Sequence, residues 1–533
     1  MYVKNLGYGL FMFRKFYVRR KERKMRINCF QKICHTFLTT LLSVSLLTGC
    51  SGNELDLSHL TDNKDKQTFD YEVPKSQPSV LVNQLGYHPE SVKNVIFIGQ
   101  NVPDQFSIID EKTGEEVFVG EIEHKGYQQD AGMNVSIGTF TNFTKEGKYY
   151  ILCDTIGQSY HFSISDMIYE SLFTDLLKEI SDNRWQEYHS ETEEIYKTDE
   201  ENSMEVSGGW YTTITDDKKV RDVKTGCETL VNLLMSVEFY VDQHSDATGI
   251  QESGNEIPDI LDEAAYEVLW LLKMQDGKTG SVYSGLTEEN GQLKLDESNI
   301  EACQHFIIAM AKFSYSMKNY DNAFATECLR ASDAAWKYVE SVRNSRKEED
   351  RALQDEIDES LRFFGAAELF RASGAYRYHT VIKEYVPNTT NENIWTKEEY
   401  LGIYTYLGTR LAVSRNICEE WMKQIMDMGK RIASDSKEDS MLALSVEDGV
   451  SCHNLLWKMT VMTSIDYIIG NHEYDTILEN NLHYILGRNI NAYSYIEDYG
   501  NDEAISSQNL SISDDLTQVS QLIFIMSEII SNR

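Results

Sequence analysis

The chain has 533 residues, of which 41% are hydrophobic, and this length is typical of about two or three domains with buried cores. It carries 50 Lys and Arg residues against 85 Asp and Glu residues, which gives a formal net charge of −35 at pH 7. So much negative charge repels phosphate backbones, and the composition therefore argues against nucleic acid as a partner.

The first 50 residues predict an export signal. A basic stretch, Met25–Lys32, precedes the apolar run FLTTLLSVSLL at 37–47, which is too short to remain as a transmembrane helix. The sequence LTGC then ends at Cys50 and resembles the cleavage site of a bacterial lipoprotein, with lipid on the Cys50 sulfur. We therefore expect an exported, extracytoplasmic lipoprotein anchored to the bacterial cell membrane, with Met25 as an alternative start. An ordinary signal peptide is the other interpretation.

Residues 51–78 are polar and contain prolines, as expected for a surface tether. Residues 79–165 then predict a β-sandwich, because seven short apolar runs follow one another with turn residues between them. In chain order the runs are SVLVNQLGYHP, NVIFIG, FSIID, VFVGEIE, VSIGTFTNF, GKYYILC and SYHFSIS.

From residue 166 onward the hydrophobic period changes to that of helices. The segment 257–275 places apolar residues on one helical face, and Pro258 and acidic residues occupy its first turn. Further helices are expected in NIEACQHFIIAMAKFSYSM, NAFATECLRASDAAWKYVESV, DESLRFFGAAELFRAS, NLLWKMTVMTSIDYII and YDTILENNLHYILGRN. Repeated helical hairpins predict a barrel or a solenoid, and periodicity alone does not choose between them.

Five segments in this order resemble glycoside hydrolase family 9, the cellulase or endoglucanase family with an immunoglobulin-like N-terminal module. They are VNQLGYHP (82–89), GGWY (208–211), 257–275 with GSVYSGLT (280–287), 358–378 and YILGRNINAYSYIEDYG (484–500). The resemblance implies an all-β immunoglobulin-like sandwich at 79–165 and an all-α (α/α)6 six-hairpin barrel at 166–533. It also implies β-1,4-glucan as the substrate class and hydrolysis with inversion.

Inversion requires two carboxyl groups on opposite sides of the glycosidic bond, one as acid and one as base for a water. The family carries Asp-Ala-Gly-Asp directly after Gly-Trp-Tyr, and its second aspartate is the base. This chain has Thr212 and Thr215 at the two aspartate positions, with Thr215 at that of the base. A threonine hydroxyl can position water, but it cannot take up the proton of that water near neutral pH.

The acid end of the motif also departs from the family. The family carries His-His-Arg and then Asn-Glu before its last helix, with the glutamate as acid. After Gly500 this sequence has no histidine, and its only arginine is Arg533. Depending on the gap, Leu510, Ser513 or Asp514 stands at the position of the acid.

Five other carboxylates are candidate substitutes for the missing pair. Asp216 and Asp217 follow the base position and could act as bases, although an exposed acidic loop is the simpler interpretation. Asp514, Asp515 and Glu503 could act as acids. For Asp514 and Asp515 the simpler interpretation is a charge pair at a helix N-terminus.

Aromatic residues supply the candidate sugar contacts, since their faces suit pyranose rings. Trp210, Tyr211 and Tyr283 are candidate substrate-binding residues, and bracing of the barrel is the alternative for the first two. His453 is expected to be a core histidine. No histidine and acidic cluster has the spacing of a metal site, so no metal ligand is assigned, although the resemblance implies that structural calcium is possible.

These observations predict a family 9 type surface lipoprotein that binds or acts on β-glucan-like polysaccharide or oligosaccharide. Inverting hydrolysis is expected to be weakened or lost, which would make the protein a pseudoenzyme. A hydrolase with a rebuilt carboxylate pair and a non-catalytic carbohydrate-binding or interaction lipoprotein are the alternatives. We expect a monomer that requires no cofactor.

Overall fold

The computed structural model describes residues 67–72, 74, 77–189, 193–197, 203–240, 245–387, 395–444, 452–496 and 511–533. The predicted export signal with Cys50, most of the tether, and the candidates Glu503 and Leu510 lie outside the described residues. Within these ranges no helix combines the length and the apolar character needed to cross a bilayer.

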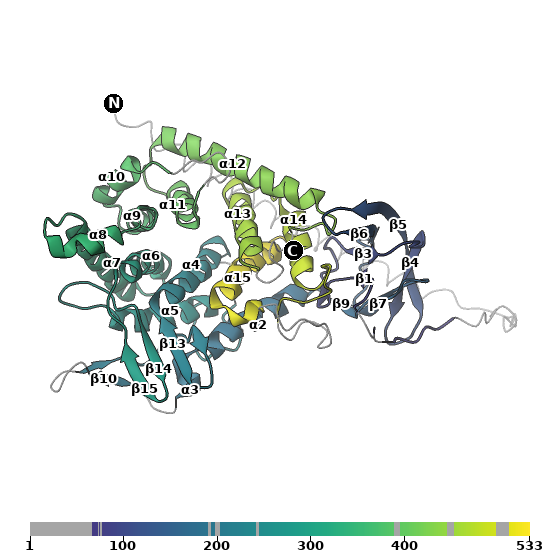
Figure 1. Cartoon of the computed structure of the whole chain (residues 1–533), viewed down its shortest axis with the longest axis horizontal. Coiled ribbons are helices and arrows are strands. Elements are labelled where there is room, and N and C mark those ends of the chain that lie inside the picture. The colour runs from purple at the N-terminus through teal and green to yellow at the C-terminus, as the bar shows by residue number, and fades with distance from the viewer. Residues whose placement is uncertain are drawn as a thin grey trace, which may run out of the picture. The chain divides into compact units, whose positions relative to one another are not determined.

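The N-terminal part is a sandwich of short strands (Figure 1). The strands pair in the order β1-β3-β6-β5-β4-β7-β9-β2, with β8 on β7. Their bounds are β1 Val80–Leu81, β2 Gly86–Tyr87, β3 Asn94–Ile98, β4 Gln105–Asp110, β5 Glu116–Gln128, β6 Met133–Thr139, β7 Gly147–Cys153, β8 Gly157–Gln158 and β9 Phe162–Ile164. The first part of β5 pairs with β4 and the second part with β6, so this one strand belongs to both faces.

Aromatic side chains fill the space between the two faces of the sandwich. Phe97, Phe106, Phe140, Tyr149 and Phe162 are at most 2% exposed and belong to one hydrophobic cluster. Their rings meet edge-on or tilted, as for Phe140 and Phe162, whose centroids lie 5.6 Å apart. The β-sandwich predicted from the alternating sequence is therefore confirmed.

The rest of the chain is mainly helical (Figure 1). The helices of four or more residues are α2 Ile168–Asp182, α3 Trp185–Tyr188, α4 Val223–Tyr240, α5 Asp259–Lys273, α6 Ile300–Met317, α7 Asn322–Arg343, α8 Arg351–Asp355, α9 Glu359–Ser373, α10 Tyr376–Glu384, α11 Lys397–Gly408, α12 Arg415–Glu438, α13 His453–Ile469, α14 Asp475–Ile485 and α15 Leu516–Ser531. Two short 3-10 turns are η1 Glu348–Asp350 and η2 Ile512–Asp514. The fold class expected from the sequence, an all-β sandwich followed by an all-α barrel, is confirmed.

Helices that are buried on nearly every side and mostly apolar form the inner layer of this domain. In α6 the buried residues run almost without interruption from Ile300 to Ser314, and in α15 from Gln518 to Ile529. Such helices are stable only when other helices surround them. Accordingly α4 packs on both α6 and α15, and α6 packs on α7 and α9. The helix pair α4 and α15 thus brings the region after GGWY next to the C-terminal end of the chain.

A buried histidine joins the sandwich to the helical domain. His483 Nε2 donates to the carbonyl oxygen of Val92 over 3.0 Å, so His483 Nδ1 accepts from the Asn83 amide over 3.0 Å. Burial lowers the pKa of His483 well below its ordinary value, in agreement with a neutral ring that uses one nitrogen as donor and the other as acceptor. The Gln84 N–H adds a bond of 2.8 Å to the Leu486 carbonyl oxygen.

Candidate functional site

The residues that follow GGWY form a β-hairpin. Strand β12 (Thr213–Ile214) pairs with β13 (Lys218–Asp222), which continues into a four-stranded sheet with β14 (Gly285–Glu289) and β15 (Gln292–Leu295). The Thr212 hydroxyl donates to the Val220 carbonyl oxygen over 3.2 Å. The Thr215 hydroxyl donates to the carbonyl oxygen of Lys218 over 3.0 Å. Both threonines, which were predicted to stand at the family's aspartate positions, therefore hold the hairpin closed.

The structure places Asp216 and Asp217 at the exposed tip of this hairpin. An Asp217 carboxylate oxygen lies 3.1 Å from the Thr215 hydroxyl, and the Asp217 carbonyl oxygen accepts from the N–H of Asn290 over 3.0 Å. The first contact lies within the turn, and the second joins it to the neighbouring turn between β14 and β15. The exposure of Asp216 and Asp217 favours a solvated acidic turn, and the role of these two residues as substitute bases stays a prediction.

The GGWY segment itself is buried against helix α5. Gly209 has φ of +81°, and a Cβ atom there would lie 2.6 Å from the Trp270 ring, so both backbone and space require glycine. The Trp210 indole N–H donates to Glu263 over 2.7 Å, and its backbone N–H donates to Glu267 over 2.7 Å. Trp210 is fully buried, which favours bracing of the barrel over contact with a sugar.

Arg184 completes a buried charged network behind GGWY. Its guanidinium donates to both carboxylate oxygens of Glu263, each over 3.0 Å, and to Glu252 over 2.9 Å. Tyr211 is also buried, and its hydroxyl lies 2.7 Å from His189 Nε2. The sequence did not single out Arg184. A signal was present, because a buried acid on an otherwise apolar helix requires a cationic partner.

A cavity of about 360 Å3 lies at the start of helices α4 and α15, and we call it the α4–α15 cavity. Its lining comprises Thr212, Lys224, Thr225, Glu228, His453, Ser511, Asp514, Asp515, Leu516, Thr517 and Gln518. The structure thus brings Thr212, which was predicted to stand at the first of the two aspartate positions, together with the candidate acids Asp514 and Asp515. It does not bring Asp216, Asp217 or the aromatic candidates into this lining.

Asp515 is the N-cap of α15 and pairs with His453 across the cavity. Its carboxylate accepts from the Thr517 N–H over 2.9 Å and lies 3.1 Å from His453 Nε2. Burial alone would raise the pKa of Asp515, but these hydrogen bonds lower it well below its ordinary value. The bond to Asp515 raises the pKa of His453 in turn. The expectation that His453 is a core histidine is wrong, because its side chain is 57% exposed.

Glu228 is the second carboxylate of the cavity that lies beside basic side chains. It lies 3.3 Å from Lys397 Nζ and 3.9 Å from His305 Nε2. Burial alone would raise the pKa of Glu228, but Lys397 and His305 lower it overall. The sequence did not predict Glu228. The only local signal in the sequence for a cationic neighbour of Glu228 is Lys224, which lies one helical turn earlier on the same face of α4, and this signal is weak.

The remaining candidates have local structural contacts. Asp514 accepts from the Ser511 backbone N–H over 3.2 Å and closes the turn η2. Ser513 lies in the same turn and is partly buried. Tyr283 is partly buried and its N–H donates to the Met274 carbonyl oxygen over 2.9 Å. The role of Tyr283 in substrate binding stays a prediction.

Asp259 and Asp262 in the first turn of α5 and Asp246 in the preceding loop form a group of oxygen ligands. Carboxylate oxygens of Asp246, Asp259 and Asp262 all lie within 4.8 Å of one another. One buried oxygen each of Asp259 and Asp262 has no hydrogen-bond partner among the described residues. Burial raises the pKa of Asp262 to about 6. An oxygen-only set with unpaired buried oxygens fits a calcium ion.

Comparison with known proteins supports a single assignment for both domains. The profile of the cellulase N-terminal ig-like domain matches residues 75–158, and that of glycosyl hydrolase family 9 matches residues 176–510. A metagenome-derived glycoside hydrolase family 9 endoglucanase has the same fold, with a TM-score of 0.70 at 19% identity. That superposition covers 85% of this chain and 99% of the other structure.

Two characterised relatives align with most of the chain. A cellodextrinase of Butyrivibrio fibrisolvens is 27% identical over 474 residues, which cover 79% of this chain and 85% of that protein. The xyloglucan-specific endo-beta-1,4-glucanase BoGH9A of Bacteroides ovatus is 23% identical over 500 residues, which cover 82% and 84%. Because the family profile spans more than half of the chain and follows the ig-like profile in order, the protein belongs to glycosyl hydrolase family 9.

Proposed function

We propose that this protein binds β-glucan-like oligosaccharide or polysaccharide in the α4–α15 cavity and has lost inverting hydrolysis. The observation that carries the proposal is the state of the cavity carboxylates. The pKa values of Glu228 and Asp515 are both lowered by cationic or hydrogen-bonding partners. An inverting pair requires one protonated and one ionised carboxyl group, and two ionised groups do not meet this requirement.

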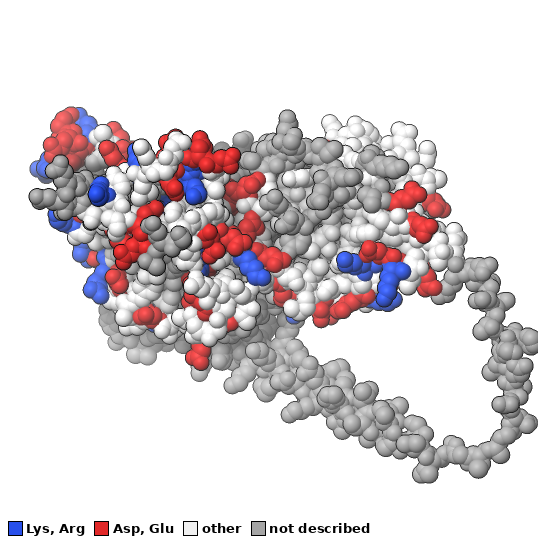
Figure 2. All heavy atoms as spheres, turned by 90° about the horizontal axis from the view of Figure 1, so that it is seen from below, with Lys and Arg blue, Asp and Glu red and all other residues white. Residues whose placement is uncertain are grey.

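The hairpin gives independent support from the other side of the cavity. Thr212 and Thr215 occupy the positions of the family's aspartates, and their hydroxyls are engaged by backbone carbonyl oxygens. Neither hydroxyl is a base near neutral pH. A glucan ligand agrees with the relatives, which are named a cellodextrinase and a xyloglucan-specific endo-beta-1,4-glucanase. An uncharged ligand also suits the face in Figure 2, where acidic side chains predominate over basic ones.

Binding and turnover measured on the same preparation test the proposal. We expect calorimetry to detect binding of cello-oligosaccharides or xyloglucan oligosaccharides. Reducing-end assays on β-glucans, xylans and mannans should show rates reduced by roughly 10²–10⁴-fold or more against an active family member, the usual effect of losing acid–base groups. The double variant Thr212→Asp, Thr215→Asp should recover little activity, because base and acid act as a unit.

Three variants separate the proposal from the rival hydrolase. Glu228→Gln should weaken binding in a protein that still folds, whereas Asp216→Asn, its control on the hairpin tip, should leave binding unchanged. Robust wild-type turnover that is abolished by Asp216→Asn or Asp217→Asn would show that the hairpin tip supplies the base. Absence of any glycan binding would instead favour an interaction protein.

We also propose that the mature protein begins at Cys50 and carries lipid there. The order of basic stretch, apolar run and LTGC supports this anchor. Mass spectrometry of the N-terminal peptide from membranes should find acylated Cys50, with at least two acyl chains, because one chain gives only marginal anchoring. A soluble product that begins at another residue would contradict the anchor.

Within the same protein, Asp246, Asp259 and Asp262 are proposed to hold structural calcium.

A further inference from the structure

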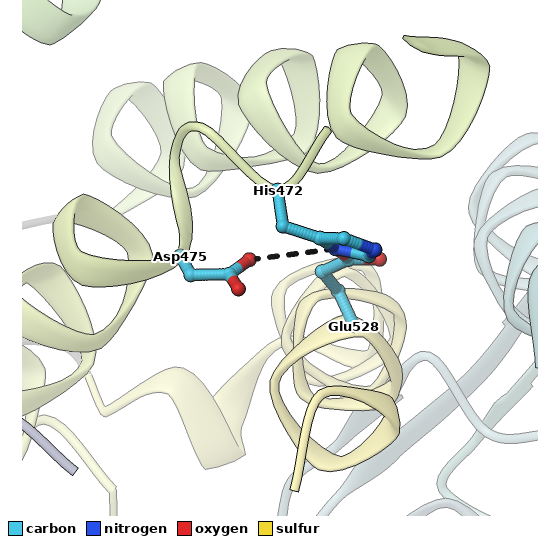
Figure 3. A group of neighbouring side chains, drawn as sticks. All are labelled: His472, Asp475 and Glu528. Carbon is cyan, nitrogen blue, oxygen red and sulfur yellow. Dashed lines mark hydrogen bonds and ion pairs between the residues drawn. The ribbon is translucent and has the colours of Figure 1, made fainter. Parts of the chain in front are cut away.

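A second group of possible metal ligands lies far from GGWY in the sequence. His472 is in the loop between α13 and α14, Asp475 begins α14, and Glu528 is on α15. Figure 3 shows the three side chains converging from these elements. One ligand atom from each lies within 4.8 Å of the other two. Sequence spacing alone does not reveal this group, because Glu528 comes from a different helix.

The separations of the ligand atoms match those around one metal ion. His472 Nδ1 lies 3.1 Å from a Glu528 oxygen and 3.8 Å from an Asp475 oxygen. Zinc bonds to nitrogen and oxygen of about 2.0–2.2 Å place neighbouring tetrahedral ligands about 3.3–3.6 Å apart. The two measured separations lie on either side of that range and the third pair of ligand atoms lies within 4.8 Å, so an ion can sit among the three atoms after side-chain shifts.

Asn532 provides a fourth polar group at the same point. Its side-chain nitrogen lies 2.9 Å from the Asp475 oxygen and 3.0 Å from the Glu528 oxygen. The oxygen and nitrogen of an amide exchange places by a rotation of the side-chain amide group, so the Asn532 oxygen can face the same point. Three protein ligands with a fourth amide or water ligand complete a tetrahedral set.

The charge balance of the group favours a cation. Glu528 is 1% exposed and Asp475 is one-third exposed, so two carboxylates face one histidine in a largely buried place. A dication bound by both carboxylates would offset the cost of burying them. The His472 side chain is 41% exposed, which leaves a route for the ion from solvent.

The loop that carries His472 is fixed from behind. Helix α13 ends at Gly470, whose φ is +64°. The Asp466 carboxylate accepts from the backbone N–H groups of Glu473 and Tyr474 over 3.0 and 2.9 Å. The neighbouring backbone of His472 is thereby held in place before any ion binds. Such prior ordering of ligands lowers the entropic cost of binding.

We propose that His472, Asp475 and Glu528 bind a divalent transition metal of the zinc class. The imidazole nitrogen separates this group from the three aspartates Asp246, Asp259 and Asp262, whose oxygen ligands suit calcium. The bound metal would join the α13–α14 loop to the C-terminal helix α15. It lies outside the α4–α15 cavity lining and supports the fold rather than the binding of glycan.

The test is metal binding to the untagged, chelator-treated full chain. Calorimetry with zinc chloride, checked by elemental analysis after dialysis, should find one zinc ion per chain that calcium does not displace. Zinc should also raise the melting temperature of the wild-type protein. His472→Ala and Glu528→Gln should each weaken zinc binding at least tenfold, in line with the loss of one ligand. Cobalt substitution of the wild type should give the visible bands of a tetrahedral site.

Two matched variants distinguish this site from other histidines and acids. His124→Ala removes an exposed histidine paired with Asp104 at 3.0 Å and should keep wild-type zinc affinity. Asp259→Asn should weaken calcium binding but not zinc binding. The proposal is overturned if the wild type binds no zinc, or if His472→Ala binds it as tightly as the wild type. Cobalt spectra decide the question even if a variant fails to fold.

Discussion

Replacing Glu263 by alanine is expected to lower the free energy of unfolding by about 3–5 kcal/mol, the usual effect of removing one partner of a buried ion pair. Glu263 is fully buried and Arg184 is 1% exposed, so the variant leaves a buried guanidinium with Glu252 as its remaining carboxylate partner. The loss also removes the acceptor of the Trp210 indole N–H. GGWY should therefore loosen along with the packing of helix α5.

Urea denaturation followed by tryptophan fluorescence measures this effect. The control is Glu348→Ala, which removes an ion pair to Arg351 at 2.8 Å in which both side chains are largely exposed. That change should alter stability by less than about 0.5 kcal/mol, because solvent screens exposed pairs. Equal stability of the Glu263 and Glu348 variants would contradict a supporting role for the buried network.

A Glu267→Gln variant is expected to be more stable than the wild type at pH 8.5 and about equally stable near pH 5. Burial raises the pKa of Glu267 from 4.5 to about 8 in the folded protein. Between these values the folded state binds more protons than the unfolded state, so stability falls as pH rises. The full difference is on the order of several kcal/mol. Glutamine stays neutral and can still accept the Trp210 N–H bond.

Chemical denaturation of both proteins from pH 5 to pH 8.5 tests this expectation. The quantity of interest is the stability difference between variant and wild type, since Asp466 and Glu528 also have raised pKa values and add to the slope of both proteins. Glu289→Gln, at the exposed end of β14, serves as control and should give a flat difference. A flat difference for Glu267→Gln as well would mean that its carboxyl group does not titrate in this range.

Much of the fold could be predicted because helical period and burial agree along single segments. The segment 257–275 was expected to be helical and forms α5, and 358–373 forms α9. The hairpin at 213–222 was not predicted. Its strands are short, its side chains are polar, and it is stabilised partly by β14, which follows much later in the sequence. Local patterning carries no information about such distant pairing.

The site was predicted only in part for the same reason. Asp514 and Asp515 were candidates because they precede the last helix, and they line the α4–α15 cavity. Glu228 was missed and His453 was misplaced, because each gains its partners from another helix. The lowered pKa of Asp515 depends on His453, which is far from it in the sequence because the rest of α13 and all of α14 lie between the two residues. Packing of α4, α13 and α15 creates these charge pairs, and this packing cannot be predicted from the sequence of any one segment.

The closed hairpin limits which side chains positions 212 and 215 can carry. An aspartate at position 215 would present a carboxylate to the Lys218 carbonyl oxygen, which now accepts a hydrogen bond from the Thr215 hydroxyl. It would also stand beside Asp216 and Asp217. The change would therefore weaken the turn, because it puts two acceptors face to face and adds a carboxylate to two neighbouring ones. The same holds for Thr212, whose hydroxyl donates to the Val220 carbonyl oxygen. A carboxylate at either position would thus cost stability of the turn before it could act on a ligand.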